Sequence, residues 1–148
     1  PNVTDLTQFP SNLDKRMKEL GIRDHIHFCG SLTADGMIQQ YLKANVFLLP
    51  SIIENSPNSL GEAMFLGTPC VAADVGGVKS IMSHEEEGLL YQHNEIRMLA
   101  DCIMRIFKLG EQIKGMSEKG KRKAELMHDC ERNCDTILRL YDEIYNTK

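Results

Sequence analysis

The clearest pattern in the chain is a pair of short apolar runs on either side of one helical repeat. Residues 46–49 (VFLL) and Cys70–Ala73 (CVAA) are too short for helices and have the length of buried strands. Between them, the apolar residues of 59–66 recur at helical spacing, and Gly67 follows where a helix C-cap is expected. The order strand, loop, helix, strand predicts a βαβ unit of a parallel sheet.

Further periodic segments extend this unit in both directions. Alternating polar and apolar residues at 25–29 (HIHFC) predict a strand ending at Gly30, and 89–91 (LLY) predicts a last short strand. Apolar residues at helical spacing predict helices at 12–20, 34–44, 78–82, 95–108, 111–127 and 131–146. The sequence therefore predicts a single α/β domain with a parallel sheet of four strands and helices on both faces.

Charged and polar residues follow the first predicted strand of the βαβ unit. In open parallel sheets, ligands bind beyond the carboxyl ends of the strands, where the loops 50–59 and 74–78 are expected. The first loop leads into a helix N-terminus, which suits an anion such as a phosphate. Glu54 lies in this loop, and Glu62 follows after seven intervening residues, about one turn into the helix. One carboxylate can then face each end of an elongated polar ligand.

Composition narrows the class of protein. The 148 residues suit one domain, and a net charge of −4 argues against a nucleic-acid-binding surface. No apolar run has transmembrane length and no signal peptide is present. Five cysteines, an odd number without a C-x-x-C pair, indicate reduced thiols, so a cytoplasmic protein is expected. A start at Pro1 suggests a piece of a longer protein.

Several separated motifs occur together in one order. They are Phe28-Cys29-Gly30, Tyr41 with Ala44, Pro50-Ser51, Glu54 with Glu62, Gly67-Thr68-Pro69, Gly76-Gly77 and Gly88-Leu89-Leu90. Across roughly residues 11–110, this series closely resembles the nucleotide-sugar-binding domain of GT-B glycosyltransferases, specifically glycosyltransferase family 4. The chain departs from the family pattern at Asn45, at 55–58, and at Lys79 and Ser80.

The resemblance implies a Rossmann-like, doubly wound parallel sheet: a partial GT-B C-terminal domain, truncated at its N-terminal side. It implies the donor-binding domain of a retaining glycosyltransferase that moves a hexose from a UDP- or GDP-type nucleotide-sugar to a glycan or lipid-linked acceptor, as in polysaccharide biosynthesis. The acceptor would bind to a missing N-terminal domain. In similar enzymes an arginine and a lysine upstream of the matched region stabilise the diphosphate, so this fragment alone is expected to fold without catalysing. No metal or cofactor is implied.

The resemblance also assigns roles to the two glutamates. In similar enzymes the position of Glu62 accepts hydrogen bonds from the donor ribose, although Ser59-x-x-Glu62 also fits a capping box, in which Glu62 only returns a hydrogen bond to the helix start. The position of Glu54 faces the transferred sugar, where a carboxylate orients hydroxyls and stabilises positive charge at the anomeric carbon. As an isolated residue, Glu54 would be an exposed loop acid.

Other positions carry weaker expectations. By the same resemblance, the backbone N–H groups of Asn58, Ser59 and Leu60 meet the diphosphate, although a routine helix start is equally compatible. Gly30 and Ser31 match the region against the nucleobase, with a strand-ending turn as the alternative. Gly76-Gly77 is expected to be a tight turn that permits close approach of the backbone to the ligand.

Two surface features have competing interpretations. His128, Cys130 and Cys134 lie close enough for metal ligands, but the cysteines are in register with an apolar stripe, which favours core packing. The basic run 119–123 (KGKRK) predicts a solvated helix face, with contact to an anionic membrane surface, and hence a membrane-peripheral location, as the alternative. Two alternatives to glycosyl transfer remain: a GT-B-like nucleotide-sugar epimerase, and a non-catalytic nucleotide-sugar-binding module.

Overall fold

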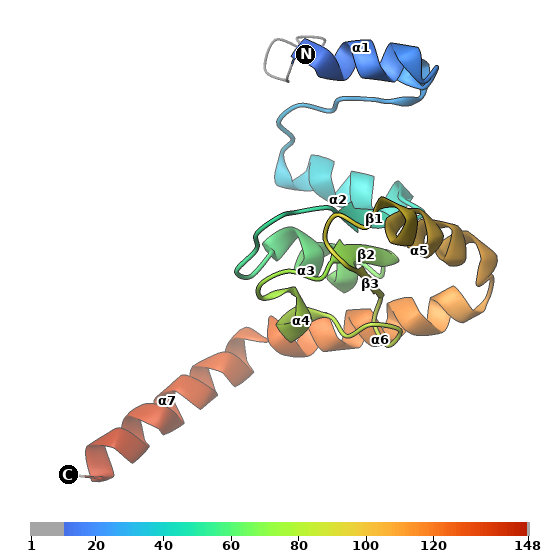
Figure 1. The fold of residues 1–148 in the computed structure, drawn as a ribbon. Coiled ribbons are helices and arrows are strands. Elements are labelled where there is room, and N and C mark those ends of the chain that lie inside the picture. Colours follow the sequence, from blue (N-terminus) through green and yellow to red (C-terminus); the bar gives the residue numbers. More distant parts are fainter. Residues whose placement is uncertain (1–10, 148) are drawn as a thin grey trace. The chain divides into compact units, whose positions relative to one another are not determined.

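The computed structural model describes residues 11–147 (Figure 1). These residues divide into two compact units, one ending at Met37 and one beginning at Ile38. The first unit contains helix α1 (Ser11–Glu19), the short 3-10 helix η2 (Arg23–His25) and the beginning of helix α2 (Ala34–Lys43). The Oγ1 atom of Thr33 accepts a hydrogen bond from the Gly36 N–H (3.2 Å) and so caps the start of α2.

The predicted strand at 25–29 is wrong. After η2, residues 26–30 have no regular secondary structure in the described chain. The Arg23 guanidinium holds this region locally, because its Nε donates to Asp14 Oδ1 (3.1 Å) and its Nη1 donates to the Ile26 carbonyl oxygen (3.4 Å). Alternation alone does not make a strand, since a strand is stabilised by hydrogen bonds to a neighbour and this segment pairs with none of the described strands.

The second unit is built on a parallel sheet of three strands. Strands β1 (Phe47–Leu49), β2 (Cys70–Ala73) and β3 (Leu89–Tyr91) lie in that order, with Leu48 opposite Val71 and Val71 opposite Leu89. The predicted α/β fold with a parallel sheet is therefore confirmed, with three strands in the described residues where the sequence predicted four.

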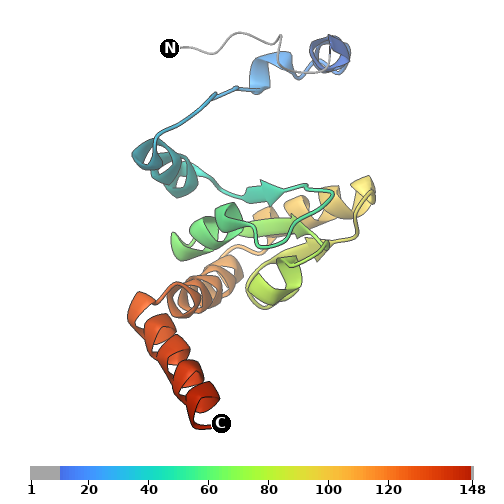
Figure 2. The same ribbon diagram turned by 90° about the vertical axis from the view of Figure 1, so that its left-hand side faces the viewer.

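Helices cover both faces of the sheet. Helix α3 (Asn58–Phe65) connects β1 to β2, α4 (Val78–Ile81) connects β2 to β3, and α5 (Ile96–Lys108) follows β3 (Figure 2). Because side chains alternate along a strand, Val71 and Leu89 point to one face, where they pack with Cys102 and Ile106 of α5. Residues of α3 such as Leu60 and Met64 are fully buried and complete the core.

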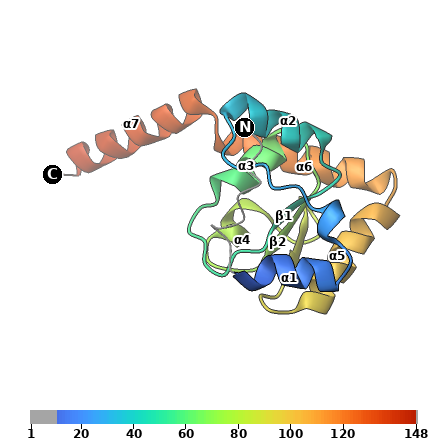
Figure 3. The same ribbon diagram turned by 90° about the horizontal axis from the view of Figure 1, so that it is seen from above.

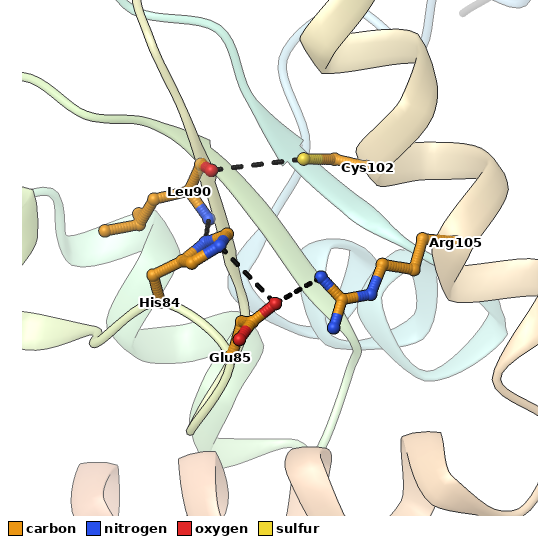
Figure 4. Close-up of polar contacts among 5 residues, drawn as sticks. All are labelled: His84, Glu85, Leu90, Cys102 and Arg105. Carbon is orange, nitrogen blue, oxygen red and sulfur yellow. Dashed lines mark hydrogen bonds and ion pairs between the residues drawn. The ribbon is translucent and has the colours of Figure 1, made fainter.

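A polar network attaches the turn before β3 to the core (Figure 4). The Nδ1 atom of His84 accepts a hydrogen bond from the Leu90 N–H (2.9 Å), and the Cys102 thiol lies 3.9 Å from the Leu90 carbonyl oxygen. The Glu85 carboxylate pairs with the Arg105 guanidinium, whose hydrogen bond lowers the pKa of Glu85. These contacts hold the turn against α5.

Helix α6 (Gln112–Met127) lies alongside α3 (Figure 3). It buries Gly120 and Ala124, and Lys123 reaches the half-buried Glu87 carboxylate (Nζ to Oε2, 3.1 Å). The Ser83 N–H donates to the same Oε2 atom (2.7 Å). The predicted solvated basic face therefore holds for the exposed Lys119, Lys121 and Arg122, whereas Gly120 and Lys123 face the protein.

Helix α7 (Cys130–Asn146) extends away from the sheet (Figure 1), and none of its residues is buried. The prediction that Cys130 and Cys134 pack in a core is wrong, because both are exposed. The apolar stripe exists, but no other described element covers it. The described residues contain no group of side chains arranged to hold a metal. No helix among them is long and apolar enough to cross a membrane.

Candidate functional site

The three strands are parallel, so their carboxyl ends lie at one edge of the sheet. The chain leaves β1 at Pro50, β2 at Asp74 and β3 at Gln92, and each of these positions opens a loop at that edge. The loops predicted at 50–59 and 74–78 are therefore present, and in the structure they span 50–57 and 74–77.

Glu54 is half-buried in the first of these loops. The Ser51 hydroxyl donates a hydrogen bond to Glu54 Oε1 (2.6 Å), which fixes the carboxylate within its own loop. The Gly77 N–H donates to the Glu54 carbonyl oxygen (3.0 Å) and so joins the backbone of the two loops. Glu54 is thus held by one residue that follows β1 and by one that follows β2.

The glycine pair makes this contact between loops sterically feasible. A Cβ atom at Gly76 would lie 1.8 Å from the Glu54 carbonyl oxygen, and one at Gly77 would lie 1.6 Å from the Asn55 carbonyl oxygen. Gly76 also has a φ of +49°, a conformation that L side chains rarely adopt. The predicted tight turn is confirmed, and the backbone that it approaches is that of the Glu54 loop.

The N-terminus of α3 begins directly after this loop. Its N-cap residue is Pro57, which provides no side-chain cap, and the first turn contains no acidic residue. The Leu60 N–H donates to the Pro57 carbonyl oxygen (3.1 Å). Within residues 11–147, nothing accepts a hydrogen bond from the N–H groups of Asn58 and Ser59, so both remain available to an anion.

Glu62 is on the exposed side of α3, one turn further along. Since α3 starts at Asn58, Ser59 lies inside the helix and the alternative capping box does not form. The Glu62 carboxylate instead accepts a hydrogen bond from the Tyr41 hydroxyl (O–H to Oε2, 3.2 Å). Burial, together with the Glu62 charge and hydrogen bond, raises the pKa of Tyr41 to about 12, so the hydroxyl stays protonated and donates.

A second polar cluster at this edge was not predicted from the sequence. Asp74 Oδ2 accepts a hydrogen bond from Gln92 Nε2 (3.1 Å) and forms an ion pair with Lys79 Nζ (2.8 Å). The signal for this cluster was present, because Asp74 directly follows β2 and Gln92 directly follows β3. Parallel pairing of adjacent strands brings such positions together.

The predicted residues belong to two different units of the structure. Glu54, Asn58, Ser59, Leu60 and Glu62 all lie in the second unit. Gly30 and Ser31 lie in the first unit, where both are exposed and Gly30 has a φ of +64°. Their contact with a nucleobase therefore stays a prediction.

The chain is similar in sequence to known proteins. Residues 7–123 match the sequence model of the family described as glycosyl transferases group 1. The chain belongs to this family. The D-inositol 3-phosphate glycosyltransferase of Saccharomonospora viridis is 30% identical over 143 residues, which are 97% of this chain and 33% of that protein.

Solved structures show the same fold. Sucrose-phosphate synthase from Thermosynechococcus elongatus matches with a TM-score of 0.81 and 26% identity over 93% of this chain and 34% of that chain. Anabaena HepE in complex with UDP matches with a TM-score of 0.84 and 21% identity over 95% of this chain and 38% of that chain. The fold is that of GT-B glycosyltransferases, and this chain spans about a third of the length of these relatives.

Proposed function

We propose that this chain is a partial C-terminal domain of a retaining, family 4 glycosyltransferase and binds a UDP- or GDP-type nucleotide-sugar. The observation that carries the proposal is the α3 N-terminus without a side-chain cap, with Glu54 before it and Glu62 one turn inside. Its free N–H groups suit a diphosphate, and the carboxylates accept hydroxyl hydrogen bonds on either side. The similarity to HepE, whose structure contains UDP, supports a nucleoside diphosphate as ligand.

Each residue has a separate role in this proposal. Glu62 accepts hydrogen bonds from the ribose hydroxyls, and the amides of Asn58, Ser59 and Leu60 face the diphosphate. Glu54 orients the transferred hexose and stabilises positive charge at its anomeric carbon. Gly30 and Ser31 contact the nucleobase.

The diphosphate needs more positive charge than this edge provides. A helix terminus supplies only about half a charge, and Lys79 is paired with Asp74. We therefore infer that further cationic residues and the acceptor site lie outside this chain, and that the chain alone is inactive. The acceptor is a glycan or a lipid-linked acceptor in polysaccharide biosynthesis, and the protein acts in the cytoplasm, with a membrane-peripheral location as the alternative. Neither nucleic acid, metal nor cofactor has a role.

A donor titration of the full-length protein tests the pocket. UDP, GDP and their glucose and mannose conjugates are titrated by calorimetry into the wild type, Glu62→Ala and the control Glu86→Ala, an exposed acid in the turn before β3. Loss of hydrogen bonds to a charged acceptor is expected to weaken binding by Glu62→Ala about tenfold or more. The control is expected to bind as the wild type does. Equal binding by Glu62→Ala, or no binding by the wild type, contradicts the proposed pocket.

Two further incubations separate the reaction classes. A transferase leaves the donor sugar unchanged without an acceptor, apart from slow hydrolysis, and forms a glycoside when a glycan or lipid-linked acceptor is added. An epimerase converts the donor by itself. Binding without either reaction identifies a non-catalytic module, for which the divergent segment 55–58 is the motivating feature.

A further inference from the structure

Tyr41 contacts two other segments of the second unit as well as Glu62. The residue is 4% exposed, and its ring packs edge-on against Phe47 of β1, with ring centroids 5.6 Å apart. Its carbonyl oxygen accepts a hydrogen bond from the buried Thr68 hydroxyl (2.9 Å), which follows α3. Its own hydroxyl donates to Glu62 Oε2 (3.2 Å). Both the backbone and the ring of Tyr41 are therefore fixed, and the hydroxyl has a defined position.

We propose that Tyr41 is a positioning residue that orients the Glu62 carboxylate and so sets a preference for ribonucleotide over 2′-deoxyribonucleotide donors. This inference rests on the proposed function, because it requires Glu62 to accept the ribose hydroxyls. It adds a residue on α2, 21 positions earlier in the chain, that acts on the donor through its hydrogen bond to Glu62.

The acceptor capacity of a carboxylate explains the orientation. Each of its two oxygens can accept about two hydrogen bonds. The Tyr41 hydroxyl occupies one of the two acceptor positions on Glu62 Oε2. In the proposed complex, Oε1 and the second position on Oε2 then accept hydrogen bonds from the two ribose hydroxyls. Without this bond, Glu62 is an exposed side chain on the helix surface, and its rotamers must be restricted when the ligand binds. The Tyr41 hydroxyl restricts them beforehand.

This arrangement makes ribose recognition depend on two residues in different ways. Removing the carboxylate abolishes the acceptor, whereas removing only the Tyr41 hydroxyl leaves the acceptor in place without its orientation. Binding of a donor that lacks the 2′-hydroxyl tests both the presence of the carboxylate and its orientation. The affinity ratio between UDP and 2′-deoxy-UDP therefore measures the function of Glu62 and the contribution of Tyr41 separately from overall binding.

The experiment measures this ratio by calorimetry in the full-length wild type, Tyr41→Phe, Glu62→Ala and the double variant. If the donor titration identifies guanine as the base, GDP and 2′-deoxy-GDP replace the uridine pair. The wild-type ratio is expected to be about tenfold, as for one hydrogen bond to a charged acceptor. The ratio is expected to fall to roughly threefold in Tyr41→Phe, and to about one in Glu62→Ala and in the double variant.

Phenylalanine retains the ring contact with Phe47, and Tyr91→Phe is the matched control, a buried tyrosine of β3 expected to keep the wild-type ratio. Thermal unfolding of each variant is recorded, so that ratios are compared only among folded proteins. A wild-type ratio in folded Tyr41→Phe, with a ratio of one in Glu62→Ala, overturns the inference alone. If the Glu62→Ala ratio also equals the wild-type ratio, or if the wild type binds no nucleotide, the proposed function fails and the inference fails with it.

Discussion

Helices α6 and α7 follow one another in the chain and have similar lengths, 16 and 17 residues, but only α6 is part of the core. Helix α7 has the more regular apolar stripe, and yet all of its described residues are exposed. Helix α6 carries the basic run and still buries Gly120 and Ala124. The comparison teaches that an apolar stripe predicts a helical face without predicting what covers it.

The small residues of α6 explain its burial. Gly120 lies against the Glu87 carbonyl oxygen, where an added Cβ would be 3.1 Å away, and against the end of the Met64 side chain of α3. Gly61 of α3 allows a closer approach by His128, the residue after α6, since an added Cβ at Gly61 would lie 2.7 Å from the His128 Nε2 atom. Close backbone approach, and the pairing of Lys123 with Glu87, bind α6 to the rest of the unit.

The largest expected difference between the core and α7 is in the rate of cysteine alkylation. Burial raises the pKa of Cys70 to about 12, from a usual value of 9.0. Because the thiolate is the reactive form, three pKa units reduce the rate by on the order of a thousandfold. Iodoacetamide at pH 8, followed by mass spectrometry of peptides, should label the exposed Cys134 that much faster than Cys70. Equal rates are expected in denaturant, and protection of Cys134 in the native protein would mean that α7 is covered.

A large side chain at Gly120 should break the attachment of α6. Gly120→Leu places atoms against the Glu87 backbone and is expected to lower the free energy of unfolding by about 3 kcal/mol. Gly115→Leu is the matched control on the same helix, because an added Cβ there meets no atom within 4 Å. The control should be neutral or stabilising by up to about 1 kcal/mol, through helix propensity. Urea unfolding of both variants measures the difference, and equal effects would exclude close packing at Gly120.

The two ion pairs of α6 should differ in their contribution to stability, and the half-buried pair should contribute more than the exposed one. Lys123→Met leaves the half-buried Glu87 carboxylate without its cation and is expected to lower the free energy of unfolding by about 1–2 kcal/mol. Arg122→Met removes an exposed pair with Glu118 and should cost less than about 0.5 kcal/mol. Urea unfolding at low and high salt checks both values. A cost for Arg122→Met as large as that for Lys123→Met would contradict the distinction.

The Glu87 pair also predicts a pH dependence. Burial raises the pKa of Glu87, but hydrogen bonds from the Ser83 N–H and from Lys123 outweigh it, so the pKa lies below its usual value of 4.5. Its stabilisation is therefore present above about pH 4.5 and is lost as the pH falls through the lower folded-state pKa. The wild type should therefore lose more stability than Lys123→Met when the pH is lowered from 7 to about 3.5, because Lys123 contributes to the lowered pKa of Glu87. Urea unfolding of both proteins at the two pH values compares these losses.

Truncation on α7 should have the smallest effect. Ile137→Ala and Tyr141→Ala remove exposed apolar side chains (52% and 67% exposed) and should change the free energy of unfolding by less than about 0.5 kcal/mol. Denaturant unfolding of the 148-residue chain measures this. A cost above about 2 kcal/mol would show that the stripe is buried in solution.

Local patterns predicted most of the fold. The apolar runs gave the exact bounds of β2 and β3, because strands buried on both faces are continuous apolar segments. The prediction of a strand at 25–29 was wrong because alternation does not show whether a partner strand lies alongside. The prediction that Cys130 and Cys134 pack in a core was wrong because periodicity does not identify the surface against which a helix packs.

The candidate site was predictable to the same extent. The spacing of Glu54 and Glu62 and the helix start between them are local features, and the structure contains both. The bond from Tyr41 to Glu62 and the cluster of Asp74 with Gln92 join residues 21 and 18 positions apart. Such contacts depend on tertiary packing, and the sequence contained only their positions beside strands and helices.

The hydrogen bond from the Gly77 amide to the Glu54 carbonyl has a mechanical consequence. Since neither Gly76 nor Gly77 has space for a methyl group there, the two loops cannot slide past one another without first separating. A movement of the Glu54 loop relative to the start of α4 would therefore have to break this hydrogen bond. The backbone of Glu54 is thus coupled to the loop that follows the central strand β2.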